Sequence, residues 1–334
     1  MEKTNNVLVT GGAGFIGSHL IEHILRYTDW DIVCLDRLDV SGNLNRIYEV
    51  ISGNQGKGFE KRFKFVYHDL KAEINTNIAH ELGKPSLIFH LAASSHVEDS
   101  IANPLLYVQD NVLGSLNLLN YAKTLDNLDY IQMFSTDEVF GYAPDGVAYK
   151  EWDVHKPRNP YSAAKSGADQ LSYAFHITYG LPLVISNCMN VIGERQDNRK
   201  YVPLVMNKLL NNEKLYVHSY PGGKRPGSRK YVHARNVASA CLFLQKNFTA
   251  GERYNFGGQI ELDNLELAQK IAKMMNKELI YELVDFHGTR PGHDLRYDLD
   301  DTKLREMGFE YPVSFDESLE KTIQWTLANP RWLQ

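Results

Sequence analysis

The sequence predicts an α/β fold, in which a Rossmann-type doubly wound parallel sheet is joined to a smaller C-terminal α/β lobe. Two observations predict it: short apolar runs alternate with longer segments of helical period, and a glycine-rich turn directly follows the first apolar run. Strands separated by helices require crossover connections, which are right-handed and leave helices on both faces of a parallel sheet. The 334 residues are enough for one large domain and a smaller companion.

Each predicted element has its own local signal. Buried apolar runs predict strands at Val7–Thr10, Ile32–Asp36, Phe63–Tyr67, Ser86–His90, Tyr130–Ser135 and Leu183–Asn187. Apolar residues at helical spacing predict helices at Ser18–Tyr27, Pro104–Asp126 and Pro160–Tyr179. Ser52–Glu60 contains three glycines, which is typical of a surface loop.

The alternating pattern loosens at about residue 190, which gives the expected domain organisation. Residues 1–190 form the sheet domain, with return segments from about 230–260. Residues 191–334 form mainly a second lobe, with a helix near Leu265–Met275 and a strand at Leu279–Leu283. Doubly wound folds bind ligands outside the carboxyl ends of their strands. We therefore expect the second lobe to cover that edge and to bind the substrate.

The composition excludes several classes of protein. The chain has 43% hydrophobic and 23% charged residues, which is typical of a soluble globular protein. A net charge of −5 gives no general attraction to nucleic acid or to an anionic membrane, so we expect neither partner. Three widely separated cysteines argue against a disulfide framework and a cysteine-rich metal site. The first apolar run is too short for a signal or membrane segment, so we expect a cytoplasmic protein without a bound metal.

The glycine-rich turn is spaced for a dinucleotide. Gly11, Gly14 and Gly17 form a Gly-x-x-Gly-x-x-Gly pattern after a predicted strand, with Phe15 and Ile16 inside it. Glycines at this spacing permit a tight turn, close approach of the backbone to a pyrophosphate, and close packing of helix on strand. All five residues are predicted to belong to a cofactor site.

The residues after the second and third predicted strands indicate which dinucleotide binds. Asp36 ends the second strand about 20 residues after the turn, where a carboxylate accepts hydrogen bonds from the adenosine ribose. Asp36 repels a 2′-phosphate, whereas Arg37 beside it can pair with one. Because the acidic residue normally decides, we predict NAD rather than NADP. Asp69 and Leu70 follow the third strand and are expected near the adenine.

Two short motifs carry the predicted chemistry. Tyr161 and Lys165 are four residues apart at the start of a predicted helix, so their side chains share one face. A nearby ammonium is expected to lower the pKa of the phenol, so that Tyr161 can take a hydroxyl proton as hydride leaves the same carbon. Thr136, Asp137 and Glu138 follow a predicted strand. Two adjacent carboxyls push their pKa values apart, which suits one acid and one base.

These motifs, in this order, resemble the extended short-chain dehydrogenase/reductase superfamily. Within it, Ser-Thr-Asp-Glu-Val-Phe-Gly at 135–141 resembles the nucleotide-sugar 4,6-dehydratases, above all those that act on dTDP-glucose. Further blocks similar to this family are His90–His96, Asn159–Lys165, Tyr179–Pro182, Tyr254–Gly258 and Arg290–Tyr297. The similarity covers nearly the whole chain, and the last block is the most specific to this branch.

The resemblance implies a reaction in which a sugar is oxidised, loses water and is reduced again with one bound NAD. Tyr161, supported by Lys165, would be the base at C4, and Thr136 would hydrogen-bond the C4 oxygen. Glu138 would remove the C5 proton that the 4-ketone acidifies, and Asp137 would protonate the departing C6 hydroxyl. The net redox change is zero, so the cofactor would stay bound through turnover.

The resemblance also implies binding residues outside these motifs. Further cofactor contacts are implied for Leu91, Ala92 and Ala93. Contacts to a nucleotide-sugar are implied for Ser95, His96, Thr136, Asn190, Lys200, Arg229, Arg290 and His293. The chain departs from the family pattern at Ser94, Glu98–Asp99, Val191–Ile192 and Gln259–Ile260. None of these is a catalytic position, so the departures bear on the identity of the substrate rather than on the type of reaction.

Several alternatives stay open at this point. UDP-glucose or another NDP-hexose is the alternative substrate. An NDP-sugar 4-epimerase or decarboxylase would use the Tyr/Lys pair and NAD, but it needs no acid–base pair for C5 and C6. A non-catalytic cofactor-binding protein would be expected to lack Tyr161, Lys165 or Glu138, and all three are present. The resemblance further implies a homodimer, joined by a four-helix bundle of Pro104–Asp126 and Pro160–Tyr179.

Overall fold

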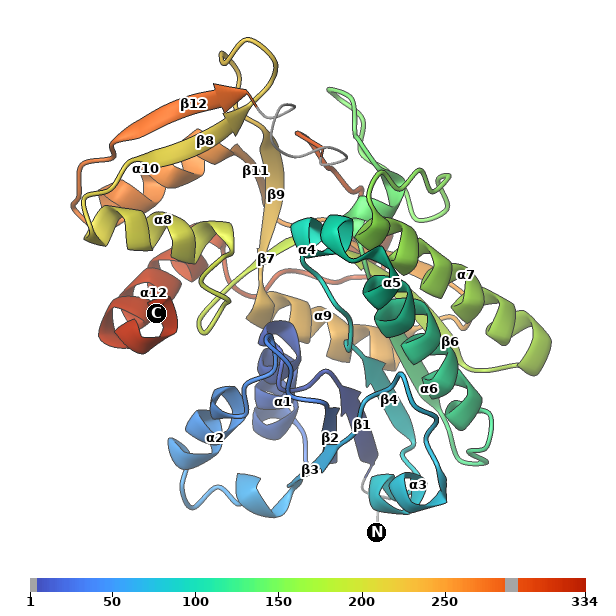
Figure 1. Ribbon diagram of the computed structural model, residues 1–334. Coiled ribbons are helices and arrows are strands. Elements are labelled where there is room, and N and C mark those ends of the chain that lie inside the picture. Colours follow the sequence, from blue (N-terminus) through green and yellow to red (C-terminus); the bar gives the residue numbers. More distant parts are fainter. Residues whose placement is uncertain (1–4, 286–293) are drawn as a thin grey trace.

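The computed structural model describes residues 5–285 and 294–334 (Figure 1). Its main element is a seven-stranded sheet with the strand order β10-β6-β5-β4-β1-β2-β3, and all neighbouring pairs are parallel. The strands are β1 (Asn6–Thr10), β2 (Asp31–Asp36), β3 (Phe63–Tyr67), β4 (Leu87–His90), β5 (Tyr130–Thr136), β6 (Leu183–Cys188) and β10 (Arg253–Phe256). The predicted doubly wound α/β fold is therefore confirmed.

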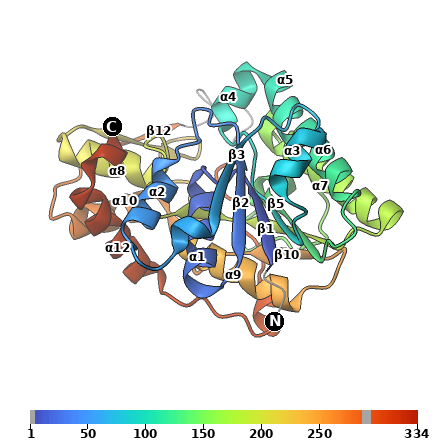
Figure 2. The same ribbon diagram turned by 90° about the horizontal axis from the view of Figure 1, so that it is seen from below.

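Helices cover both faces of this sheet (Figure 2). One face carries α1 (Phe15–Tyr27), α2 (Asn45–Ser52) and α9 (Ala234–Asn247), and the other carries α3 (Thr76–Leu82), α6 (Gly114–Ala122) and α7 (Pro160–Tyr179). The pleat divides each strand between two cores: Val7 and Val9 of β1 pack on the α1 side, and Leu8 packs on the α6 side. Burial on both faces explains why the strands are continuous apolar runs.

The strand order places the topological switch point between β1 and β4. The chain runs from β1 through β2 to β3 at one edge, and then returns to β4 on the other side of β1. The turns that follow β1 and β4 therefore meet, and the N–H of Leu91 donates to the carbonyl of Thr10 at 3.0 Å. Ligands of doubly wound folds bind at such a point.

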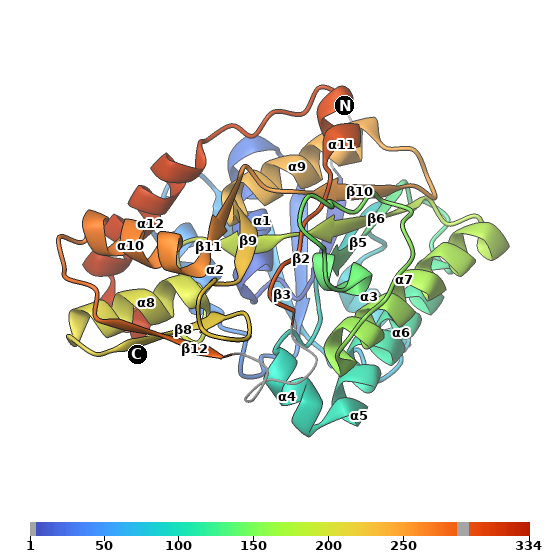
Figure 3. The ribbon, with the colours of Figure 1, turned by 90° about the horizontal axis from the view of Figure 1, so that it is seen from above.

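Two small sheets and three helices build the second lobe (Figure 3). One sheet has the order β11-β9-β7, formed by β7 (Asn190–Ile192), β9 (Ser228–His233) and β11 (Ile260–Asp263), and the other pairs β8 (Leu215–Ser219) with β12 (Tyr281–Asp285). The lobe has its own apolar core under α8 (Tyr201–Leu210), α10 (Asn264–Met274) and α12 (Phe315–Ala328). Between β9 and β11 the chain returns to the large sheet, where α9 packs on α1 and β10 adds an edge strand.

Some elements differ from their prediction. The single helix predicted over Pro104–Asp126 is divided into α5 (Pro104–Tyr107), a π-helix (Val108–Leu113) and α6, and it ends at Ala122. A π turn adds a residue to the helical turn, which the apolar spacing of a sequence does not reveal. The edge strand β10 is not predicted, because four residues carry little periodic signal. The remaining short elements are α4 (Val97–Ala102), α11 (Thr302–Glu306) and 3₁₀ turns at Phe59–Lys61, Asp137–Phe140 and Pro330–Leu333.

Candidate active site

The start of α7 is fixed by its own sequence. Asn159 caps the helix by accepting a hydrogen bond from the N–H of Ser162 at 2.8 Å, and the Ser162 hydroxyl returns a bond to the cap. Pro160 at the first helical position suits the helix, since its fixed backbone angle is helical and no N–H is lost. The capped end holds Tyr161 and Lys165 in the first turns, next to the carboxyl end of β5.

The carboxyl end of β5 turns at once into a 3₁₀ turn that begins at Asp137. The Thr136 hydroxyl donates to Asp137 Oδ1 at 2.8 Å and accepts from the N–H of Glu138 at 3.3 Å. On the neighbouring strand β6, the side-chain amide of Asn187 donates to the Thr136 carbonyl at 3.2 Å. These bonds orient three consecutive polar side chains at the carboxyl end of β5.

Glu138 is held by residues from two distant parts of the chain. The Asn159 side-chain amide donates to Glu138 Oε2 at 3.0 Å, and the Tyr297 hydroxyl donates to the same oxygen at 3.4 Å. Burial raises the pKa of Glu138, whereas the bond from Asn159 and the charges of Arg229 and Lys200 lower it. Two cations of the second lobe thus act on a carboxylate of the sheet domain.

Asp137 is the most buried carboxyl of this pair. Its side chain is 5% exposed, and among the described residues no group hydrogen-bonds its Oδ2 atom. Burial, and then the charge of Glu138, raise the pKa of Asp137 to about 7. A carboxyl with such a pKa carries its proton in a large part of the molecules near neutrality, as a general acid requires.

Replacing Asp137 with Asn is expected to stabilise the protein in a pH-dependent way. The pKa of Asp137 rises from 3.8 to about 7 on folding, so its contribution to stability is present below about pH 4 and is lost as the pH rises through 7. Asn cannot ionise, so the free energy of unfolding of Asp137→Asn should exceed that of the parent by more at pH 8 than at pH 5. The expected change in this gap is on the order of 3 kcal/mol. Denaturant unfolding at both pH values measures it.

The control for this experiment is the same substitution at Asp126, which is exposed. Asp126→Asn should leave the difference between pH 5 and pH 8 as it is in the parent protein, because a solvated carboxylate gains little from folding. An equal gain for Asp137→Asn at both pH values would show that Asp137 does not hold its proton in the folded state.

Tyr161 and Lys165 lie side by side on α7 and are both buried. The predicted lowering of the phenol pKa is wrong for the protein alone: burial and the charges of Glu138 and Asp137 raise the pKa of Tyr161, and only a hydrogen bond with Thr136 opposes them. The Lys165 ammonium instead donates to the Phe134 carbonyl at 2.6 Å, and burial lowers its own pKa. Ionisation of Tyr161 therefore needs additional positive charge in the site.

Behind Lys165 lies a buried polar network that the sequence did not indicate. Asp169, one turn further along α7, accepts from the Ser135 hydroxyl at 2.7 Å and from Arg253 at 3.5 Å. The charge of Asp169 raises the pKa of Lys165 and so partly offsets the effect of burial. Ser135 is thus turned toward this network rather than toward the Thr136 side of the site.

Nine of the predicted cofactor residues line one pocket at the switch point. Its lining includes Gly11, Gly14, Asp36, Arg37, Asp69, Leu70, Leu91, Ala92 and Ala93. Tyr161 and Lys165, also predicted to contact the cofactor, are not among its lining residues. Gly17 lies behind the turn, where an added Cβ would collide with the backbone of Gly11 and Gly12. Phe15 and Ile16 open α1 and do not line the pocket.

The backbone around this pocket fits a dinucleotide. Gly11 has φ +69°, and a Cβ there would lie 2.5 Å from the N atom of Ala92, so only glycine permits this close approach. Gly14 precedes α1 and gives it no side-chain cap. The N–H groups in the first turn of this 13-residue helix are therefore available to bind an anion. The Asp36 carboxylate is fixed by the N–H groups of Ala13 at 3.0 Å and Leu38 at 2.9 Å. NAD would thus be held by the turn at its pyrophosphate and by Asp36 at its ribose.

The predicted substrate residues come from both lobes. Lys200 Nζ donates to the carbonyl of Ser95 at 3.4 Å, so these two lie together. His96 Nε2 lies 2.7 Å from Arg199 and 3.6 Å from Asp197.

Two further predicted substrate residues, Asn190 and Arg229, belong to the second lobe. The Nδ2 atom of Asn190 is buried and has no hydrogen-bond partner among the described residues. Arg229 donates to the carbonyls of Ser228, Asp294 and Leu295, and its guanidinium lies 4.5 Å from the centre of the Tyr297 ring. Arg290 and His293 lie outside the described residues.

Sequence reasoning missed four residues of this region: Asn159, Tyr297, Asp169 and Asp110. Asn159 had a signal, since Asn followed by Pro is typical of a helix start. Asp169 follows Lys165 at helical spacing, which places it on the same face. Tyr297 ends the family-like block Arg290–Tyr297, but only the fold brings it to Glu138. Asp110 had no local signal, because only the fold brings it to the cofactor pocket.

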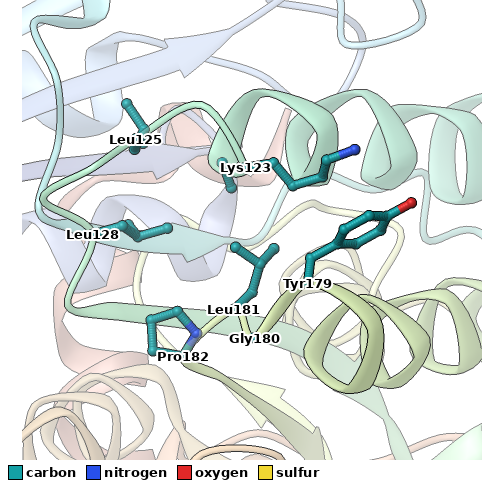
Figure 4. Close-up of a pocket in the computed structure, with 8 residues that line it drawn as sticks. Lys123, Leu125, Leu128, Tyr179, Gly180, Leu181 and Pro182 are labelled. Atoms are coloured by element: carbon teal, nitrogen blue, oxygen red, sulfur yellow. The ribbon is translucent and has the colours of Figure 1, made fainter.

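A second hollow lies at the carboxyl end of α7, and Figure 4 shows the residues that line it. It is formed by Ala122, Lys123, Leu125, Leu128, Tyr179, Gly180, Leu181 and Pro182. Lys123 Nζ lies 4.1 Å from the centre of the Tyr179 ring. Tyr179 ends the 20-residue α7, so the hollow is about 30 Å from the capped end that carries Tyr161. It is therefore separate from the candidate active site.

Two negative findings apply to residues 5–285 and 294–334. No His, Cys, Asp and Glu side chains there gather in a group of three or more that could hold a metal ion. In the same residues, no helix is both long enough and apolar enough to span a membrane.

The fold and the site together define a dinucleotide-binding protein of the extended short-chain dehydrogenase/reductase superfamily. The chain belongs to the family described as GDP-mannose 4,6 dehydratase, whose model matches residues 8–322. The resemblance to nucleotide-sugar dehydratases is thereby confirmed.

Individual relatives agree with this assignment. The dTDP-glucose 4,6-dehydratase of Salmonella typhimurium is 33% identical, over 98% of this chain and 94% of its own length. The crystal structure of the dTDP-glucose 4,6-dehydratase of Streptomyces venezuelae, which contains NAD, aligns over 98% of both chains with a TM-score of 0.86 and 32% identity. The UDP-glucose 4-epimerase of Thermus thermophilus, also with NAD, aligns over 95% of this chain and 97% of its own with a TM-score of 0.84 and 27% identity.

Proposed function

We propose that this protein is an NAD-dependent NDP-glucose 4,6-dehydratase, a hydro-lyase that converts dTDP-glucose to dTDP-4-keto-6-deoxyglucose. The observation that carries the proposal is the pair Asp137 and Glu138 at the end of β5, in which burial and mutual repulsion raise the pKa of Asp137 to about 7. Elimination of water across C5 and C6 needs one group that takes a proton and one that gives a proton. This pair supplies both beside the Tyr161 phenol.

The chain's own residues prepare the C4 end of the sugar. When bound, NAD would accept hydride from C4 and return it to C6. Tyr161 would take the C4 hydroxyl proton, and the Thr136 hydroxyl would hydrogen-bond the C4 oxygen. Lys165, beside Tyr161 on α7, would support the phenol once the pocket is filled, and a bound oxidised nicotinamide would add the positive charge that opposes the two carboxylates. A 4-ketone then makes the C5 proton acidic.

The elimination step falls to the two carboxyls. Glu138, held by Asn159 and Tyr297, would remove the C5 proton and later return a proton to C5. Asp137, protonated near neutrality, would give its proton to the leaving C6 hydroxyl. Lys200 and Arg229 act electrostatically on Glu138, and they are suited to bind the diphosphate when it enters. Arg229 would need to exchange at least one of its carbonyl partners for a phosphate oxygen.

An NDP-sugar 4-epimerase or decarboxylase is the alternative on this scaffold. The overall fold does not choose, because a dehydratase and an epimerase align with TM-scores of 0.86 and 0.84. The carboxyl pair favours the dehydratase, since a reaction confined to C4 has no use for a second acid and base. UDP-glucose and other NDP-hexoses remain the alternatives for the substrate.

We also propose a cytoplasmic homodimer. Leu105, Val108, Leu113, Tyr173 and Ile177 are exposed on α5, the π-helix and α7, where two copies could bury them together. The three cysteines are free and buried, which suits a reducing compartment.

The test of the function is turnover in deuterated water with dTDP-, UDP-, GDP- and CDP-glucose, followed by mass spectrometry. We expect dTDP-glucose to give a product lighter by one water, with solvent deuterium at C5 and no net formation of NADH. The same product from UDP-glucose alone would correct the nucleotide. An epimerised sugar without loss of water would reject the dehydratase.

A further inference from the structure

Arg37, at the ribose end of the cofactor pocket, has its hydrogen-bonding capacity filled by carboxylates. Its Nε and Nη2 donate to Asp39 at 3.0 and 2.7 Å. Its Nη1 and Nη2 donate to the two oxygens of Asp110 at 2.5 and 2.7 Å, and Nη1 also reaches Asp69 at 3.5 Å. A guanidinium has five N–H donors, and these five contacts use all of them.

Asp110 lies in the π-helix. It is the third residue of the segment Val108–Leu113, and its side chain is only 3% exposed although it lines the cofactor pocket. The Ser94 hydroxyl donates to Asp110 Oδ2 at 2.5 Å, which fixes the carboxylate from the β4 side. Lys71 Nζ lies 3.9 Å away. π turns often occur at functional sites, and this one puts a buried carboxylate opposite Arg37.

These contacts determine which charged groups would surround a 2′-phosphate on the adenosine ribose. An arginine beside the acidic residue that ends the second strand is the group that accommodates such a phosphate in NADP-binding folds. Here the pocket contains four carboxylates, Asp36, Asp39, Asp69 and Asp110, against the two cations Arg37 and Lys71. A phosphate could recruit Arg37 only by displacing Asp110 and Asp39, two charged partners, in a partly buried setting.

We propose that Asp110, together with Asp39, is a specificity determinant that reserves the pocket for NAD by holding Arg37 away from a 2′-phosphate. Asp36 excludes the phosphate by direct repulsion, and the clamp on Arg37 removes the cation that could compensate. This inference rests on the proposed function only in that the pocket binds a nicotinamide dinucleotide.

The test uses 2′,5′-ADP and 5′-AMP as probes of the ribose end, titrated calorimetrically into cofactor-free protein. The variants are Asp36→Ser, Asp36→Ser with Asp110→Asn, and the same pair with Arg37→Ala. We expect Asp36→Ser alone to gain less than about threefold in affinity for 2′,5′-ADP, and the double variant to gain a further tenfold or so. Arg37→Ala should cancel that further gain.

A second route guards against damage to the buried site. Asp36→Ser with Asp39→Asn weakens the hold on Nε and on one N–H of Nη2 of Arg37 through a partner that is 37% exposed, while Nη2 keeps its bond to Asp110. This variant should show the same direction of change. As long as 5′-AMP still binds, two results would overturn the inference. One is the full gain in affinity for 2′,5′-ADP in Asp36→Ser alone, and the other is a gain in that affinity that survives Arg37→Ala. Failure of the parent protein to bind NAD and 5′-AMP would overturn the cofactor site itself, and this inference with it.

Discussion

Glu138→Gln is expected to abolish the release of dehydrated product and to leave reduced nicotinamide trapped on the enzyme. The amide keeps the size of the side chain and can still bond to Asn159 or Tyr297, but it cannot accept the C5 proton. Oxidation at C4 does not need this proton, so it should proceed. General-base catalysis contributes about 10²–10⁴ in rate, and a loss of at least this size is expected. Product by mass spectrometry and enzyme-bound NADH by absorbance measure the two steps separately.

The matched control is Glu151→Gln. Glu151 is also buried, at 7% exposure, and it accepts a bond from the N–H of Asn255 rather than facing the candidate active site. This variant should keep the turnover rate of the parent. If Glu138→Gln releases product at the parental rate, Glu138 is not the C5 base, and Asp137 becomes the group to test.

Tyr161→Phe should slow the step that precedes elimination. Without the hydroxyl, the proposed acceptor of the C4 proton is lost, so single-turnover formation of NADH should fall by about 10²–10⁴. Loss of product should follow to the same extent, without trapped NADH. This pattern differs from that of Glu138→Gln, in which NADH accumulates. Stopped-flow absorbance over one turnover distinguishes the two variants.

Tyr130→Phe is the control for that variant. Tyr130 is the fully buried first residue of β5 and donates to Gln132 at 3.0 Å, so the variant loses one hydrogen bond of similar kind outside the candidate active site. Its rate of NADH formation should match that of the parent. Normal NADH formation by Tyr161→Phe would remove Tyr161 from the role of base.

The raised pKa of Tyr161 bears on when the phenol can act as a base. Burial and the carboxylates Glu138 and Asp137 oppose ionisation of the phenol, and the Lys165 ammonium is bonded to the Phe134 carbonyl. In the protein alone, the phenol therefore keeps its proton. Oxidised NAD brings a positive charge that opposes the carboxylates, so binding of the cofactor and ionisation of Tyr161 should favour each other.

Much of the fold was readable in the sequence because its signals are local. Six of the seven strands and the helix Pro160–Tyr179 follow from apolar runs and from the Asn-Pro start. A tight turn beside a pyrophosphate requires glycines, and a ribose hydroxyl requires an acceptor such as Asp36. The spacing between them therefore predicted the cofactor pocket. The edge strand β10 and the π-helix escaped, because a short edge strand and one extra residue in a turn leave no period to detect.

By itself, the sequence determined the fold class, the family resemblance and the chemical types at the site: a carboxyl pair, a phenol with a lysine, and an acidic residue for the ribose. The tertiary structure alone decided how those groups are tuned. It brought Tyr297 to Glu138 across 159 residues of chain, put Asp169 and Arg253 behind Lys165, and set Asp110 against Arg37. The physical reason is that burial and the distance between charges determine a pKa and the freedom of a guanidinium, and both quantities arise only when distant segments pack together.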